Sequence, residues 1–95
     1  MELRHLRYFV AVAEALSYRR AAQRLRVAQP ALSKQIKDLE AEVGARLLER
    51  NTGGVRLTDA GTVLLEEARD ILERVEMAAR AARDAEAGRT GRLTI

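Results

Sequence analysis

The chain contains no cysteine, no tryptophan and a single histidine, His5, among its 95 residues. Disulfide bonds are therefore impossible, and a zinc site built from cysteine and histidine is excluded. Aromatic residues are also scarce and make up 3% of the chain. Proteins that bind single-stranded nucleic acid stack the bases on aromatic side chains, so the composition disfavours that class of protein.

The sequence also lacks a long apolar run. No stretch approaches the roughly 20 apolar residues that span a membrane, and we find no signal-peptide pattern. We therefore expect a soluble, cytoplasmic protein with no membrane partner. Ninety-five residues, of which 47% are hydrophobic and 33% charged, suffice for one compact domain with its own core.

Positive charge is concentrated in the first part of the chain. Residues 1–57 carry 11 basic and 6 acidic groups, whereas residues 58–95 carry 6 basic and 8 acidic groups, for a total of +3. The stretch from Ser17 to Lys37 contains six basic side chains and no acidic one. A continuous cationic surface of this kind is typical of proteins that bind nucleic acid.

Three helices are predicted in residues 3–43. The first has apolar side chains at helical spacing, namely Leu3, Leu6, Phe9, Val10 and Ala13. Ser17 is a suitable N-cap for a short second helix. A turn over residues 26–28 then leads into a third helix, which Pro30 opens and Gly44 ends. The second and third helices would form a helix–turn–helix.

The third helix, at about residues 29–43, has two chemically different sides. Its predicted buried stripe consists of Leu32, Ile36, Leu39 and Val43. Its other side is polar and cationic near the N-terminus and comprises Gln29, Pro30, Ala31, Ser33, Lys34 and Lys37. Acidic residues follow in the second half, so the N-terminal end is the one suited to DNA.

A β-hairpin is predicted after the third helix. Leu47 and Leu48 begin a short strand, residues 51–54 have the composition of a turn, and residues 55–57 form the returning strand. Arg50 and Arg56 are expected at the base of this hairpin. Packed beside the helix pair, the hairpin would form a wing.

A long final helix is predicted from Thr58, its N-cap, to about Ala87. Apolar residues recur along it in alternating steps of three and four, which is the spacing of a coiled-coil seam. Such a seam is not expected to be buried on residues 1–57 alone, so we predict dimerisation. The expected interface residues are Leu64, Ala68, Ile71, Leu72, Val75, Ala78 and Ala82.

Three stretches together match the pattern of a known family. They are LRHLRYFVAVAEALSYRRAAQRL at 3–25, VAQPALSKQIKDLEAEVGARLLER at 27–50 and VRLTDAG at 55–61. The chain thus resembles the N-terminal module of LysR-type transcriptional regulators. This resemblance implies a mainly α fold, with a winged helix–turn–helix at residues 1–57 and a long linker and dimerisation helix at 58–87. Residues 88–95 would be a hinge and the start of an absent effector-binding domain.

The resemblance also implies a binding mode. The third helix would enter the major groove of double-stranded DNA, and the wing would lie near the adjacent minor groove. The residues that would read bases are Gln29, Pro30, Ala31, Ser33 and Lys34. The residues that would bind phosphates are Ser17, Arg19, Arg20, Lys37, Arg50 and Arg56. The chain would pair as a homodimer on a two-fold-related operator, and the intact regulator would be a tetramer. No cofactor is expected here, and a small-molecule effector would bind the absent domain.

The chain departs from the family pattern at three places. Ala28 stands where serine is common, so the third helix loses a side-chain cap. Tyr18 stands where phenylalanine is common, and its hydroxyl either reaches the surface or needs a partner. The wing tip, residues 52–54, lacks the basic residue that many members carry. This last departure argues against an arginine inserted into the minor groove.

Other interpretations stay open at this point. The helix arginines can form an ordinary solvated face, the wing arginines can pair with Glu49 or Glu2, and Gln29 and Ser33 can serve local hydrogen bonds. His5 is expected at the surface or the edge of the core. The chain can also be an interaction protein that works through its long helix. An enzyme is disfavoured, because the sequence has no recognisable nucleophile–base pair, metal cluster or phosphate-binding loop.

Overall fold

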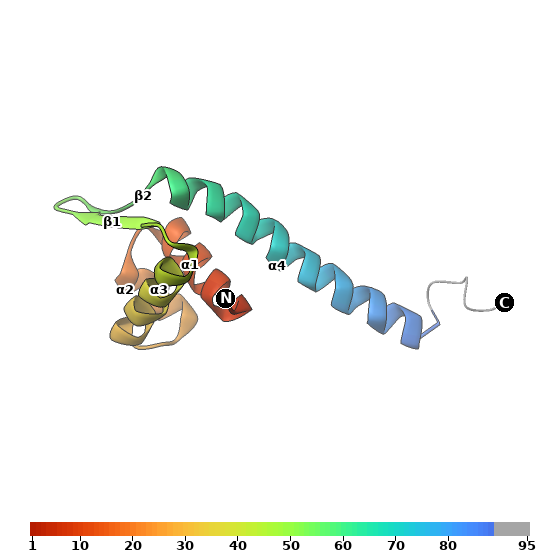
Figure 1. Cartoon of the computed structure of the whole chain (residues 1–95). Helices are drawn as coiled ribbons and strands as arrows, with labels where there is room; N and C mark the ends of the chain where they lie inside the picture. Colours follow the sequence, from red (N-terminus) through yellow and green to blue (C-terminus); the bar gives the residue numbers. More distant parts are fainter. Residues whose placement is uncertain (89–95) are drawn as a thin grey trace.

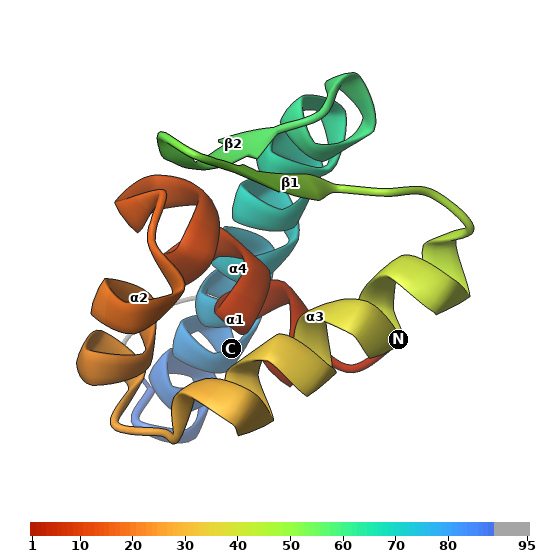
Figure 2. The same ribbon diagram turned by 90° about the vertical axis from the view of Figure 1, so that its left-hand side faces the viewer.

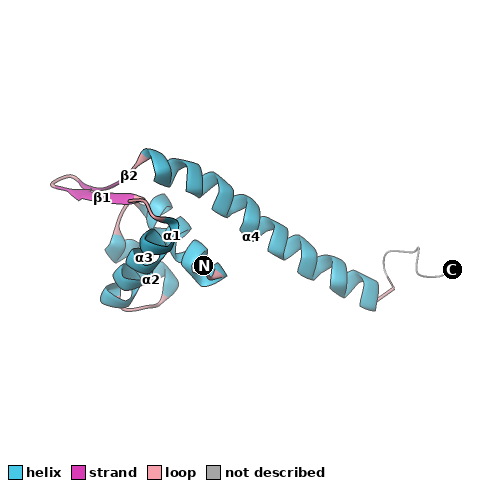
Figure 3. Ribbon diagram, viewed as in Figure 1, coloured by secondary structure: helices cyan, strands magenta, loops and turns pink. Residues whose placement is uncertain are grey.

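The computed structural model describes residues 1–88, and the predictions for residues 89–95 lie outside them. This part of the chain forms four helices and one antiparallel hairpin (Figures 1 and 3). In chain order the elements are α1 (Leu3–Ala15), α2 (Tyr18–Leu25), α3 (Gln29–Val43), β1 (Leu48–Asn51), β2 (Gly54–Leu57) and α4 (Asp59–Glu86). The predicted fold class, a mainly α winged helix–turn–helix with a long final helix, is confirmed.

Helices α1, α2 and α3 form a head, with the hairpin along one side and α4 running out beyond it (Figures 1 and 2). Helix α1 is central, because it contacts each of the other three helices. The largest fully buried side chains are Phe9, Val12, Leu32, Ile36, Leu39 and Leu47. Small residues at Ala21 and Ala22 are also buried, which allows the helices around α2 to approach closely.

The predicted apolar faces are right at their centres and wrong at their edges. In α1, Leu3 is exposed, whereas Val12 is buried although the predicted stripe omitted it. The buried face is centred on Phe9, and Val12 lies one turn further along it, while Leu3 falls outside it. In α3, Val43 is 39% exposed because the last turn lies at the edge of the head, where residues 41–44 are all exposed.

His5 is buried, with 8% of its surface exposed, and thus lies deeper than predicted. Its Nδ1 accepts a hydrogen bond from the Glu2 backbone N–H at 3.2 Å, as part of a capping box. The same Nδ1 lies 3.6 Å from Glu42, whose carboxylate also binds the Met1 ammonium at 2.6 Å. The hydrogen bond to Glu42 raises the pKa of the Met1 amine. The start of α1 is thereby tied to the last turn of α3.

Local caps set the bounds of the helices. As predicted, the side chains of Ser17 and Thr58 each accept a hydrogen bond from the backbone N–H three residues later, at 3.1 and 2.9 Å. Helix α3 has no side-chain cap, because its N-cap residue is Ala28. Gly44 ends α3 in the left-handed region, with φ at 82°, as the sequence predicted.

The hairpin register corrects one prediction. The pairs are Leu48↔Leu57, Glu49↔Arg56, Arg50↔Val55 and Asn51↔Gly54. Arg56 lies near the base, but Arg50 adjoins the turn, because the first strand ends one residue after it. Since side chains alternate along a strand, Arg50 shares one face of the hairpin with Val55, and Arg56 shares the other with Glu49.

Helix α4 begins in close contact with the head and then leaves it, so that the molecule extends 61 Å along its longest axis (Figure 1). The absence of a side chain at Gly61 allows the start of α4 to lie close to the head. A Cβ atom at this position would lie 2.1 Å from the Leu47 carbonyl oxygen. Further along, Arg69 Nη2 pairs with the Glu14 carboxylate of α1 at 3.1 Å. These contacts fix the direction in which α4 leaves.

The first half of the predicted seam on α4 is covered within the protomer. Ala68 is fully buried, and Leu64 and Leu72 pack against the same core. The prediction that residues 1–57 cannot bury the seam is therefore wrong for this half, because α1 lies alongside α4 and covers it. Ala68 is thus unavailable to a second protomer. The other predicted seam residues are accessible to solvent to different degrees: Val75 is half-buried, whereas Ile71, Ala78 and Ala82 are exposed.

Candidate nucleic-acid interface

The N-terminal half of α3 forms an open polar surface. The predicted base-reading residues are together there, since Gln29, Pro30, Ala31 and Lys34 are exposed and Ser33 is half-buried. Lys34 Nζ is paired with the Asp38 carboxylate, one turn later, at 3.0 Å. Both side chains of this ion pair are substantially exposed, so the pair is weak and can be exchanged for contact with another anion.

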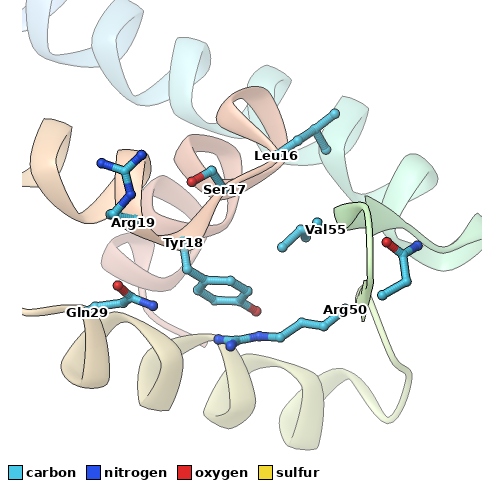
Figure 4. A pocket seen from close by; sticks show the side chains of 9 residues that line it. Leu16, Ser17, Tyr18, Arg19, Gln29, Arg50 and Val55 are labelled. Carbon is cyan, nitrogen blue, oxygen red and sulfur yellow. The ribbon is translucent and has the colours of Figure 1, made fainter.

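Arg50 connects the hairpin to both helices of the helix–turn–helix. Its guanidinium carbon lies 4.2 Å from the centre of the Tyr18 ring, which is a cation–π contact. Its Nη2 also donates a hydrogen bond to Ser33 Oγ at 3.2 Å. Figure 4 shows the Arg50 side chain running from the hairpin past the Tyr18 ring. A residue predicted to bind phosphate therefore also holds the wing against the helices.

Tyr18 is a site residue that the sequence predictions did not assign. Burial raises the pKa of its hydroxyl, and the positive charge of Arg50 partly opposes that shift. The signal was present as a departure from the family pattern, because a hydroxyl at this position needs either water or a partner. The structure places the ring of Tyr18 against the Arg50 guanidinium.

A groove of about 670 Å³ lies between α3 and β1. Its lining residues are Tyr18, Ser33, Lys37, Glu40, Arg46, Leu48 and Arg50. The Glu40 carboxylate is directed at the backbone, where its Oε2 accepts from the Leu47 N–H at 2.8 Å and the Leu48 N–H at 3.2 Å. Three lining residues carry positive charge against this one engaged carboxylate, so the groove suits an anion.

Arg46 is the cation of this groove that the sequence predictions omitted. It follows Gly44 by two residues and precedes the hairpin. The available signal was a basic side chain directly after the end of the third helix, beside a surface that was already cationic. Its position in the groove follows from the path of the loop that connects α3 to β1.

A second, smaller groove of about 250 Å³ lies where the starts of α2 and α3 meet the hairpin (Figure 4). It brings Ser17, Arg19 and Gln29 onto one concave surface with Arg50. Ser17 Oγ already accepts the capping hydrogen bond of α2. The predicted phosphate-binding residues Ser17 and Arg19 are thus beside the predicted base-reading surface.

Arg56 is not part of this surface. It lies on the opposite face of the hairpin and pairs with Glu49 Oε1, at 3.1 Å from its Nη2 and 3.2 Å from its Nε. For Arg56, the structure thus has the salt bridge that the sequence left as an alternative. On α2, Arg20 and Arg24 are exposed, and Arg26 follows in the turn with φ at 59°.

Two further findings concern residues 1–88. No helix in this range is long and apolar enough to cross a membrane. The same range contains no group of three or more histidine, cysteine, aspartate or glutamate side chains placed to hold a metal ion.

A helix–turn–helix whose second helix exposes a polar, cationic end, with a hairpin packed beside it, defines the winged helix–turn–helix class. Comparison with known families gives a match over residues 3–62 to the family described as "Bacterial regulatory helix-turn-helix protein, lysR family". The chain belongs to this family, as the resemblance predicted.

Several curated relatives are regulators of transcription. TfdT of Cupriavidus pinatubonensis is 47% identical over 95 residues, which cover all of this chain and 42% of TfdT. BudR of Klebsiella aerogenes is 50% identical over 95 residues, which cover all of this chain and 66% of BudR. Both are described as HTH-type transcriptional regulators. The chain therefore spans less than two thirds of the length of either relative.

Solved structures agree with this relationship. The CbnR_DBD–DNA complex matches 90% of this chain and 99% of its own, with a TM-score of 0.87 and 48% identity. The complex of BenM_DBD with catB site 1 DNA matches 93% of this chain and 99% of its own, with a TM-score of 0.89 and 44% identity. The chain thus has the fold of a LysR-type DNA-binding domain, together with its long helix.

Proposed function

We propose that this chain is the DNA-binding module of a LysR-type transcriptional regulator and binds a specific sequence in double-stranded DNA. The observation that carries the proposal is the open N-terminal half of α3, flanked by a groove with three cationic residues. Family membership supports it, as do the DNA complexes formed by the similar CbnR and BenM domains. We assign no catalytic role to the chain.

In this proposal, the N-terminal end of α3 enters the major groove, which is wide enough to admit a helix. The chemistry of its exposed residues suits base reading. The Gln29 amide can pair with adenine, Pro30 or Ala31 can contact a thymine methyl group, and Lys34 can reach guanine or a phosphate. Contacts to base edges specify sequence, whereas a contact to phosphate positions the protein without specifying sequence.

The phosphate contacts would come from the residues around the two grooves and from α2. Lys37, Arg46 and Arg50 line the larger groove, and Arg19 lines the smaller one. Arg20 is exposed beside Arg19 at the start of α2. The hairpin would lie near the adjacent minor groove. Its tip, residues 52–53, carries no basic side chain, so the contact there would depend on backbone and shape.

Dimerisation would use the part of the α4 seam that α1 leaves open. Val75, Ala78 and Ala82 follow Ile71 along one side of the helix at coiled-coil spacing. Two protomers paired in this way would place two copies of α3 on a two-fold-related operator. We further propose that the intact regulator is a tetramer with an additional domain that binds a small-molecule effector.

The test is selection of bound sites from random duplex DNA by the 95-residue chain. We expect enrichment of a motif with two-fold symmetry. Affinity for the motif should fall steeply between two salt concentrations, because phosphate contacts release counterions. Equal binding to all duplexes, with salt dependence alone, would contradict a sequence-specific function.

A further inference from the structure

Ser33 lies in the middle of the predicted base-reading surface, yet its side-chain oxygen is already in use. Arg50 Nη2 donates a hydrogen bond to Ser33 Oγ at 3.2 Å. A guanidinium group has N–H donors and no acceptor, so the direction of this hydrogen bond is fixed by its chemistry. Ser33 therefore accepts a hydrogen bond from the wing, and its own hydroxyl proton is left to be donated elsewhere.

Arg50 is held in this position from two sides. Its guanidinium lies on the half-buried Tyr18 ring at the start of α2, at 4.2 Å from the ring centre. Its backbone is paired with Val55 in the hairpin. A side chain anchored at its root and stacked at its end loses little further freedom when it makes a hydrogen bond. The contact with Ser33 is thus part of the way the wing rests on α3.

The charge of Arg50 also changes what the Ser33 hydroxyl can do. A cation beside Ser33 Oγ polarises the O–H bond, which makes the hydroxyl a stronger donor and its oxygen a weaker acceptor. The same charge repels the hydroxyl proton and directs it away from the guanidinium. The open end of α3, where Gln29 and Pro30 are exposed, is the surface on which a donor at Ser33 would act.

We propose that Arg50 sets Ser33 as a hydrogen-bond donor, which selects a base with an acceptor on its major-groove edge. Guanine, adenine and thymine each present such an acceptor, whereas cytosine presents an amino donor. Arg50 is then a positioning residue for one base pair, even where it also contacts a phosphate. This inference rests on the proposed function and deepens it, because it states which bases the Ser33 position accepts.

The test measures binding of the 95-residue chain to its selected site and to variants of that site. In each variant, one base pair is replaced by one of the other three. The protein variants are Ser33→Ala, Arg50→Met and the double variant. Arg56→Met is the matched control, because Arg56 lies on the opposite face of the same hairpin. We expect the wild type to disfavour cytosine by about three- to tenfold at one position, which is the effect of a single hydrogen bond.

Ser33→Ala and Arg50→Met are each expected to remove that preference at that same position, with no further loss of preference in the double variant. Arg56→Met should leave it unchanged. A thermal melt shows that each variant is folded, and Arg50→Leu, which also lacks an N–H donor, gives the same comparison if Arg50→Met does not fold.

The inference is wrong if Arg50→Met weakens binding to all four duplexes alike and leaves the single-position preference intact. It is also wrong if Ser33→Ala removes a preference for cytosine. Equal binding of all duplexes by the wild type is a different result, since it would overturn the proposed function and this inference together.

Discussion

The head and the long helix bury their apolar side chains in different ways. In the head, α1, α2, α3 and the loop before β1 cover one another, and residues such as Phe9 and Leu39 are completely shielded. In α4, the half beside α1 is covered, whereas the other half leaves Ala78 and Ala82 exposed. The surface proposed to bind DNA is therefore assembled within one protomer. The second half of α4 is instead left open by the protomer, and it is there that the proposed second molecule would pack.

The largest expected change in stability distinguishes the covered half of α4 from its exposed half. Ala68→Glu would place an unpaired carboxylate at a fully buried position against the head, so we expect it to lower the free energy of unfolding by about 3–5 kcal/mol. Ala81→Glu is the matched control at an exposed position of the same helix, with an expected change below about 0.5 kcal/mol. Chemical denaturation measures both. Equal losses in the two variants would show that the halves of α4 do not differ in this way.

The next effect concerns the point where α4 meets the head. Gly61→Ala would bring a Cβ atom against the Leu47 carbonyl oxygen, where backbone has to move, so we expect a loss of about 3 kcal/mol in stability. Gly53→Ala is the control, because a Cβ atom there meets only an ordinary contact at 3.5 Å. A Gly61→Ala variant with the melting temperature of the wild type would contradict the close packing of the start of α4 against the Leu47 backbone.

A smaller effect is expected on association. Ile71→Glu introduces a charge into the seam, so we expect the dimer dissociation constant to rise at least about tenfold, or about 1.4 kcal/mol. Met77→Glu is the control, because Met77 is also exposed but lies on another side of α4. Sedimentation velocity over a range of concentrations measures the change. An unchanged monomer–dimer distribution for Ile71→Glu would remove the seam from the proposed interface.

The smallest expected change in stability concerns helix capping inside the head, where α2 has a side-chain cap and α3 does not. Ser17 caps α2, whereas Ala28 leaves α3 uncapped with a backbone already in the extended conformation that an N-cap residue adopts. Ala28→Ser is therefore expected to raise the free energy of unfolding by about 0.5–1 kcal/mol, and Ser17→Ala to lower it by about 1 kcal/mol. Thermal melts of both variants check the opposite signs.

The bounds of the elements could be predicted because they depend on nearby residues. Ser17, Gly44 and Thr58 cap helices where the sequence indicated, and each cap involves backbone groups within a few positions. The family pattern then gave the order of helices and hairpin. Within the site, the exposed end of α3 also followed from helical spacing, since its buried and open sides are three or four residues apart.

Contacts between elements could not be predicted in the same way. Arg50 was expected at the base of the hairpin, but the register places it beside the turn and within reach of Ser33. Arg46 lies in the site because of the path of the loop between α3 and β1. The seam on α4 shows the same limit, because its spacing predicts an apolar stripe but not which surface covers it. The assignments of residues to bases and phosphates stay predictions, and the binding experiments test them.

Because α4 contacts the head only through its first half, the direction of this helix affects how far the molecule can reach. At about 1.5 Å per residue, its 28 residues form a rod about 42 Å long, and the Gly61 and Arg69 contacts both lie in its first half. The second half of α4, about 21 Å long, extends beyond these contacts, so a tilt of about 5° moves its far end by about 2 Å. In the proposed dimer, the displacements of two such helices would add up to about the spacing of 3.4 Å between successive base pairs. The direction in which α4 leaves the head would therefore help to set the distance between the two half-sites that a dimer can span.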